Sequence, residues 1–167
     1  MTYFDALGLE PALVIDADDL KKRFYERSRA WHPDKFSRAS AEEQQKALDM
    51  TALLNDAFRT LRDPVKRAEY FLLEKGIELA KDVPPELLEE VFELNMALEE
   101  MRGGDESVRP QLIEAQEKFA AMRAEIDEQL SRLFESEDLQ AIRGLLNRRR
   151  YISNLVREVD KELNVHV

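Results

Sequence analysis

The sequence contains no cysteine among its 167 residues. Disulfides, a zinc ion or iron–sulfur cluster held by the chain's own thiolates, and a cysteine nucleophile are therefore excluded. No apolar stretch approaches the roughly 20 residues that span a bilayer, and residues 1–5 form no basic and apolar leader. We therefore expect a cytoplasmic protein.

Glycine is also scarce, with five residues, and these form no phosphate-binding loop. The chain shows no cluster of residues with the spacing of metal ligands either. We therefore expect no catalytic residues, no metal site and no cofactor.

The composition that remains is suited to helices. Long stretches of Ala, Leu, Glu, Lys, Arg and Gln with few β-branched residues favour an all-α fold, and a hydrophobic share of 44% is enough for packed cores. The net charge of −10 argues against general binding to nucleic acid or to anionic membranes.

Caps and apolar spacing divide the chain into two domains. In residues 1–76 we predict four helices. The first is short and ends at Gly8, and the second runs from Asp16 to about Trp31. The third follows a capping box of Ser40 and Glu43, and the fourth runs from Asp63 to near Gly76. Residues 77–83 are short and partly apolar, which predicts a stiff linker. In residues 84–167, helices from Pro84 to Met101, from Pro110 to Phe134, and from a Ser136 cap to Leu163 predict an antiparallel three-helix bundle.

The tripeptide His32-Pro33-Asp34 separates the second and third predicted helices. A residue before proline is disfavoured in the helical conformation, so the second helix should stop before His32. The tripeptide should therefore lie at the exposed tip of a helical hairpin, a common place for a docking element. The helix before it carries a basic face, with Lys21, Lys22, Arg23, Arg27 and Arg29.

In the second domain, the first helix carries two apolar stripes. Leu87, Val91, Leu94, Leu98 and Met101 suit the bundle core, whereas Leu88, Phe92 and Met96 form a surplus stripe flanked by Glu89, Glu93 and Glu100. One helix of a three-helix bundle rarely buries two stripes. The surplus stripe therefore predicts a surface for a protein partner.

Residues 1–76 resemble a J domain. The resemblance rests on the basic helix with Lys21-Lys22-Arg23-Phe24, on His32-Pro33-Asp34, and on the run from Asn55 to Tyr70 that includes Arg67-Ala68-Glu69-Tyr70. Together with the Tyr3-Phe4-Asp5 start, the continuation Lys35-Phe36 and the acidic C-terminal bundle, essentially the whole chain is similar to the HscB-type co-chaperones of iron–sulfur cluster assembly.

The resemblance implies two protein partners. A DnaK-class (HscA-type) ATPase would be bound and stimulated by His32, Pro33, Asp34, Lys21, Lys22, Arg23 and Arg27. An IscU-type scaffold protein, on which clusters are built, would be bound by Leu88, Phe92, Glu93, Met96, Glu100 and Tyr151. The chain would then deliver the scaffold to the ATPase.

Other interpretations of the same residues remain open. The chain could be a J-domain co-chaperone for a different client, or a helical scaffold without a chaperone role. An enzyme is disfavoured because Pro33 places His32 and Asp34 on a helix tip, not in a cleft, and because His166, the second histidine, is at the end of the sequence. Arg148-Arg149-Arg150 could suggest nucleic acid, but within an acidic domain it is more typical of an exposed basic turn of helix that pairs with glutamates.

Overall fold

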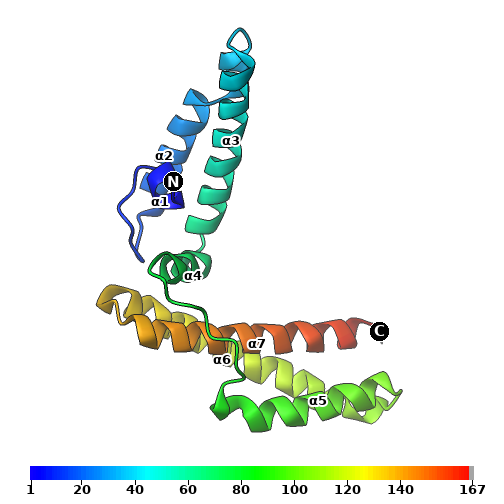
Figure 1. Cartoon of the computed structure of the whole chain (residues 1–167). Coiled ribbons are helices and arrows are strands. Elements are labelled where there is room, and N and C mark those ends of the chain that lie inside the picture. The colour runs from blue at the N-terminus through cyan, green and yellow to red at the C-terminus, as the bar shows by residue number, and fades with distance from the viewer. Residues whose placement is uncertain (166–167) are drawn as a thin grey trace. The chain divides into compact units, whose positions relative to one another are not determined.

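The computed structural model of the chain describes residues 1–165, so His166 lies outside the described residues (Figure 1). Every regular element within that range is a helix, which confirms the all-α prediction. The chain forms two compact units, Met1–Glu78 and Leu79–Val167.

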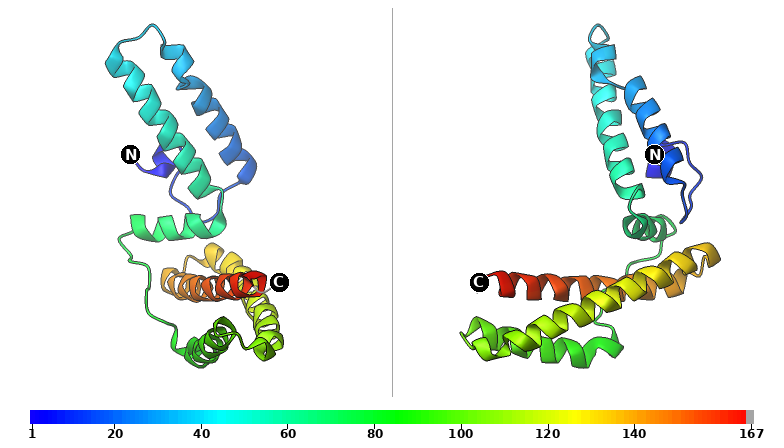
Figure 2. Two further views of the ribbon diagram at one scale, coloured as in Figure 1. Left: turned by 90° about the vertical axis from the view of Figure 1, so that its right-hand side faces the viewer. Right: turned by 180° about the vertical axis from the view of Figure 1, so that it is seen from behind.

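The N-terminal unit is a helical hairpin with two shorter helices. Its elements are α1 (Tyr3–Ala6), α2 (Ala17–Ala30), the 3-10 helix η1 (Pro33–Phe36), α3 (Ala41–Leu61) and α4 (Pro64–Glu74). Helices α2 and α3 lie side by side in opposite directions, and α1 and α4 both pack against α3 (Figures 1 and 2). The largest fully buried side chains of this unit are Phe4, Leu7, Leu13, Leu20, Leu54, Leu61 and Leu72.

Short polar side chains start these helices at the predicted positions. The carboxylate of Asp16 accepts from the Asp19 amide at 2.9 Å, and the Asp63 carboxylate accepts from the first turn of α4. Ser40 accepts from the Glu43 amide at 3.2 Å and so caps α3. These bonds satisfy amides that have no partner inside the helix, and they fix where α2, α3 and α4 begin.

Arg67 joins three segments of the N-terminal unit. Its side chain is only 8% exposed, and it donates to the carbonyls of Leu13 and Leu61 at 2.7 Å each. Burial lowers the pKa of this guanidinium, and the nearby Asp63 carboxylate opposes that effect. The loop after α1 and the end of α3 are therefore both tied to α4.

The C-terminal unit is a bundle of three helices, α5 (Leu88–Arg102), α6 (Arg109–Ser136) and α7 (Leu139–Val165), with short 3-10 turns η2 (Pro85–Leu87) and η3 (Glu106–Val108). Helices α6 and α7 form a long antiparallel pair, and α5 packs against both (Figure 2). The core includes Leu87, Leu94, Leu98, Met101, Leu112, Phe119, Ile126, Leu130, Ile142, Ile152 and Val159.

The predicted cap of the last helix was wrong. Ser136 still belongs to α6, and its hydroxyl donates to the Leu133 carbonyl of that helix. The carboxylate of Asp138 caps α7 instead, because it accepts from the Ala141 amide at 3.2 Å. Between the two helices, Glu137 turns the chain in a left-handed conformation with φ 55°.

Candidate docking surfaces

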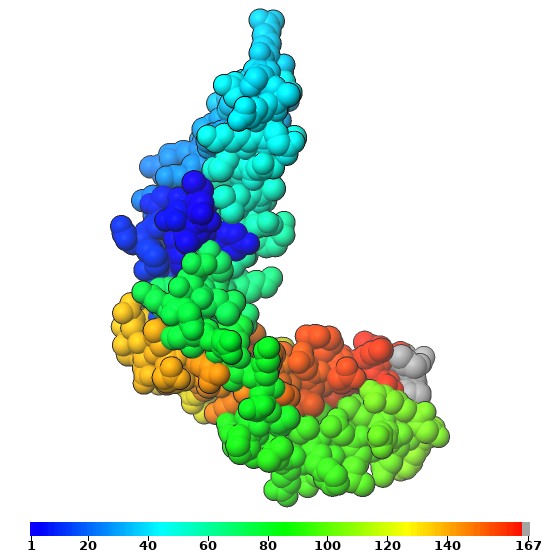
Figure 3. Space-filling model, viewed as in Figure 1, coloured from blue at the N-terminus to red at the C-terminus, as the bar shows by residue number. Residues whose placement is uncertain are grey.

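The tripeptide lies at the end of α2, and the tip of the α2–α3 hairpin projects beyond the rest of the N-terminal unit (Figure 3). His32 is extended, with φ −60° and ψ 130°, as expected for a residue before proline. Its Nδ1 accepts from the Asp34 amide at 3.2 Å, and its carbonyl accepts from the Lys35 amide at 2.9 Å. Two local hydrogen bonds and the proline ring therefore hold the tripeptide in one shape.

This shape determines which atoms can meet a partner. Because Nδ1 of His32 acts as an acceptor, the ring proton of the neutral imidazole is on Nε2, which can donate outward. The His32 side chain is 58% exposed and the Asp34 side chain is 93% exposed, and Nδ1 lies 3.6 Å from a carboxylate oxygen of Asp34. The tip thus presents a donor and an anion side by side.

The predicted basic face is divided between two sides of α2. Lys21 and Lys22 are exposed and lie one helical turn before Tyr25, which is 51% exposed. Arg29 is exposed one turn after Tyr25 on the same side. We call Lys21, Lys22, Tyr25 and Arg29 the docking face.

Arg23 and Arg27 instead turn toward the loop after α1. Arg23 pairs with Asp19 at 2.9 Å and donates to the Gly8 carbonyl at 2.6 Å. A Cβ on Gly8, whose φ is +66°, would lie 2.1 Å from a terminal nitrogen of Arg27. The structure therefore leaves Lys21 and Lys22 exposed on the side of α2 that carries Tyr25 and Arg29, and it gives Arg23 and Arg27 contacts within the unit.

A groove separates the docking face from the tripeptide. It has a volume of about 350 Å³ and is lined by Tyr25, Ser28, Arg29, His32, Asp34 and Lys35. Sequence reasoning missed Tyr25 as a surface residue. The spacing could have indicated it, because Tyr25 follows Lys21 by four positions and therefore lies on the same face of the helix. The Lys21 ammonium lies 5.9 Å from the centre of the Tyr25 ring.

The surplus stripe of α5 is exposed, as its spacing predicts. Leu88, Phe92 and Met96 are 55%, 66% and 50% exposed. Of the stripe predicted for the core, Leu94, Leu98 and Met101 are buried on another face of α5, Leu87 is buried in η2 just before it, and Val91 is half-buried. Glu93 and Glu100 are exposed beside them. We call Leu88, Phe92 and Met96 the α5 stripe.

Tyr151 is placed differently from the other residues of this predicted surface. It lies on α7, is half-buried, and its hydroxyl donates to the Lys81 carbonyl at 2.6 Å. One turn earlier, the Asn147 amide donates to the Asp82 carbonyl at 2.9 Å. Tyr151 and Asn147 therefore hold the start of the C-terminal unit against α7.

The three consecutive arginines of α7 have partners within their own unit. The Nε atom of Arg148 lies 3.2 Å from a carboxylate oxygen of Glu86, and that of Arg149 lies 2.5 Å from a carboxylate oxygen of Asp127. The guanidinium carbon of Arg150 lies 5.3 Å from the centre of the Tyr151 ring. These contacts account for the arginines within the bundle and favour the structural interpretation of the run.

Within residues 1–165, no three His, Asp or Glu side chains gather closely enough to hold a metal ion. In the same range, no helix combines the length and the apolar character needed to cross a membrane.

Comparisons with known proteins match both units. A family model described as the DnaJ domain matches residues 2–70, and one described as the HSCB C-terminal oligomerisation domain matches residues 83–160. A co-chaperone protein HscB homolog of Shewanella baltica (strain OS223) is 39% identical over 146 residues, which cover 84% of this chain and 82% of the relative.

Two solved structures are similar over nearly the whole chain. Chaperone HscB from Vibrio cholerae is 30% identical, with a TM-score of 0.73 and full coverage of both chains. Human co-chaperone HscB is 28% identical, with a TM-score of 0.73 over 96% of this chain and 81% of the human one. The chain therefore belongs to the HscB family of J-domain co-chaperones, whose homologues stimulate the HscA ATPase and deliver the IscU scaffold protein to it.

Proposed function

We propose that this chain acts in the cytoplasm, where it binds an HscA-type ATPase of the DnaK class with its N-terminal unit and an IscU-type iron–sulfur scaffold protein with its C-terminal unit. The observation that carries the proposal is the tripeptide between α2 and α3, which two local hydrogen bonds hold and in which the side chains of His32 and Asp34 are both exposed. The chain itself catalyses nothing, and the ATPase performs the chemistry.

On the ATPase side, we propose that His32, Pro33 and Asp34 make the specific contacts and that the docking face guides the encounter. A donor and a carboxylate at fixed spacing suit polar groups on the partner, and exposed lysines attract an acidic surface. Tyr25 adds an aromatic contact in the groove beside His32. Arg23 and Arg27, whose side chains are engaged with the loop at Gly8, contribute by holding α2 in place as well as by their charge.

On the scaffold side, we propose that the α5 stripe is the centre of the interface and that Glu93 and Glu100 form its acidic rim. An exposed aromatic with two neighbouring apolar side chains is a typical energetic centre of a protein interface. Tyr151 takes part from α7, where its bond to the Lys81 carbonyl already fixes its ring.

We propose the functional division 1–76 for the J domain, 77–83 for a short stiff linker and 84–167 for the scaffold-binding bundle. The bonds from Asn147 and Tyr151 to the carbonyls of Asp82 and Lys81 support a linker whose last residues are ordered. A chain that holds both partners raises the local concentration of the scaffold at the ATPase, which adds to any direct stimulation.

The test is steady-state ATP hydrolysis by the HscA-type ATPase, with and without the scaffold protein. We expect stimulation that the scaffold increases, and we expect His32→Gln to abolish it because glutamine cannot reproduce the donor geometry at the tip. The matched control is His166→Gln, which removes the only other histidine. Equal stimulation by the His32→Gln variant would exclude a J-domain function.

The scaffold surface has its own test. Phe92→Ala removes a side chain that is 66% exposed, so it should leave the fold intact while weakening scaffold binding about tenfold or more, as at an interface hot spot. Leu73→Ala, which truncates an apolar side chain with 54% exposure in the N-terminal unit, is the control. Stimulation that does not depend on the scaffold, with no scaffold binding, would indicate a J-domain co-chaperone for a different client.

A further inference from the structure

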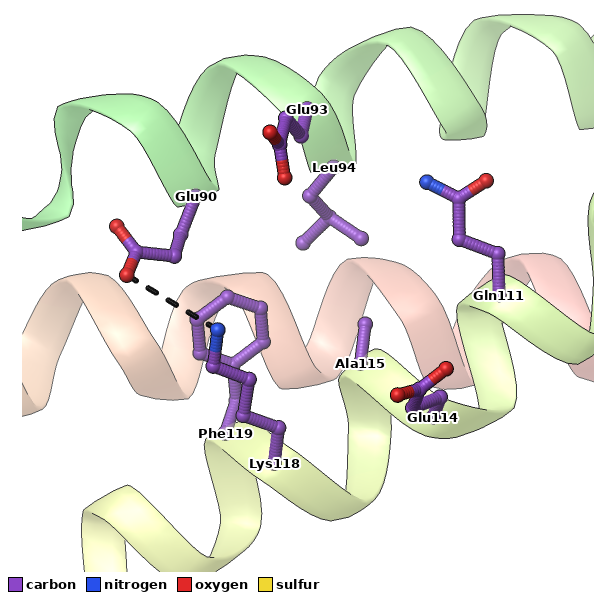
Figure 4. Close-up of a pocket in the computed structure, with 8 residues that line it drawn as sticks. All are labelled: Glu90, Glu93, Leu94, Gln111, Glu114, Ala115, Lys118 and Phe119. Atoms are coloured by element: carbon purple, nitrogen blue, oxygen red, sulfur yellow. Dashed lines mark ion pairs between the residues drawn. The ribbon is translucent and has the colours of Figure 1, made fainter.

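A second groove lies in the C-terminal unit, between α5 and the first half of α6 (Figure 4). Its volume is about 210 Å³. Sites for small organic ligands usually measure roughly 300–1,000 Å³, so this groove is better suited to one side chain than to a whole ligand. Its lining includes the apolar side chains of Leu94 and Phe119 and the charged side chains of Glu90, Glu93, Glu114 and Lys118.

The groove has an apolar floor and an acidic rim. Leu94 and Phe119, which are 4% and 2% exposed, belong to the bundle core and form part of the floor. Glu90 and Glu93 from α5 and Glu114 from α6 supply carboxylates around it (Figure 4). An apolar floor below several carboxylates fits a lysine or arginine, whose aliphatic stem packs on apolar surface while its cation remains at the rim.

The groove already contains one cation of the chain itself. Lys118 Nζ lies 3.9 Å from a carboxylate oxygen of Glu90, and these side chains are 57% and 30% exposed. A pair this long and this exposed contributes little stability, so a partner's cation could replace it at low cost. One ammonium among three carboxylates also leaves the rim with an excess of negative charge.

We infer that this groove receives one lysine or arginine side chain of the scaffold protein bound on the α5 stripe. The inference rests on the proposed function, because it extends that interface. Glu93 connects the two surfaces, since it borders the groove and lies three residues before Met96 on the helix. The bound scaffold would thus contact α6 as well as α5, and Glu114 would help to select a client with a basic residue at that place.

The test is isothermal titration of the scaffold protein into the full-length chain. Glu114→Gln should weaken binding about three- to fivefold, as expected for one partly exposed ion pair. Glu117→Gln is the matched control, because it removes the same charge from an exposed residue of α6 that does not line the groove. This control should change the affinity for the scaffold by less than about 1.5-fold, because salt screens the charge of a residue that lies outside the groove.

Lys118 provides a test in the opposite direction. Lys118→Gln removes the competing internal cation, so it should strengthen scaffold binding about twofold. Its control is Arg132→Gln, because Arg132 lies 3.9 Å from Glu128 and is similarly exposed. The basic residue of the scaffold is found by replacing each of its lysines and arginines with methionine. One replacement should lose its effect in the Glu114→Gln background, as coupled partners do.

The outcomes separate this inference from the proposed function. If Phe92→Ala weakens binding while Glu114→Gln and Glu117→Gln have equal effects, the scaffold surface stands and the groove inference is wrong. If the scaffold does not bind, or if Phe92→Ala has no effect, the proposed scaffold surface fails and the groove inference fails with it. Heat from Mg²⁺ alone that disappears in Glu114→Gln would make the groove a metal-ion site and would also overturn the inference.

Discussion

Replacing Arg67 with methionine should destabilise the N-terminal unit strongly. Methionine keeps most of the length and apolar character of the stem but removes both donors to the Leu13 and Leu61 carbonyls. Both acceptors are buried, so no water can replace the guanidinium without a rearrangement.

The size of the effect follows from the two bonds. A hydrogen bond from a charged donor contributes about 1.5–3 kcal/mol, and a buried acceptor left without a partner costs a similar amount. The cost of burying the guanidinium, which is visible in its lowered pKa, disappears in the variant and offsets part of the loss. We therefore expect the free energy of unfolding to fall by about 3 kcal/mol.

Trp31 makes the measurement specific to the N-terminal unit, since it is the only tryptophan of the chain. In urea, with an m-value of about 1 kcal/mol/M for a unit of this size, its fluorescence midpoint should move down by about 3 M. Arg67→Lys should recover only part of the loss, because one ammonium cannot reproduce the planar fork that reaches both carbonyls. A Met variant within about 0.5 kcal/mol of the original chain would refute this account of Arg67, since surface substitutions produce changes of that size.

Three further perturbations test other contacts. Burial raises the pKa of the Tyr70 hydroxyl above its ordinary value, so the neutral form is favoured in the fold. The stability that the neutral Tyr70 hydroxyl contributes is complete at a pH below the pKa of Tyr70 in the unfolded chain. It is lost as the pH rises through the pKa of Tyr70 in the folded chain. An absorbance titration should show one tyrosine that ionises late and that Tyr70→Phe removes; four tyrosines ionising together would contradict this. Gly8→Ala places a Cβ on a backbone with φ +66°, so it should cost about 1 kcal/mol in the tryptophan assay even when the end of the Arg27 side chain moves aside. An unchanged urea midpoint would show that the loop relaxes freely. Arg102→Met removes the cation 2.6 Å from Glu162, whose side chain is 10% exposed, and should cost about 2 kcal/mol in thermal unfolding followed by circular dichroism. No loss of stability would mean that this pair does not help to hold α5 on α7.

Features set by neighbouring residues could be predicted from the sequence. His32 leaves the helix because Pro33 follows it, and Asp16, Ser40 and Asp63 begin helices because their side chains reach amides two or three residues away. The exposed α5 stripe was also predictable, because it depends only on helical spacing and on the number of faces that a bundle can bury.

Features set by distant residues could not be predicted in this way. The basic residues of α2 share one helix, but Arg23 turns from the tip because it meets the Gly8 carbonyl, 15 positions away. The bond from Tyr151 to Lys81 joins residues 70 positions apart. The Ser136 error has a local origin, since Ser136 and Asp138 can both cap a helix. The choice depended on Glu137 adopting a left-handed φ, which is uncommon outside glycine.

The distribution of charge helps to explain how one chain could serve two partners of different character. Residues 79–167 carry 20 acidic and 12 basic side chains, whereas residues 1–78 carry 15 and 13, so most of the net charge of −10 belongs to the C-terminal unit. Because salt screens charges beyond about 8 Å at physiological ionic strength, each surface is governed by its own neighbours. Lys21, Lys22 and Arg29 can therefore attract an acidic partner although the whole chain is acidic. Glu93 and Glu114 favour a basic partner by the same reasoning, so each surface disfavours the partner that suits the other.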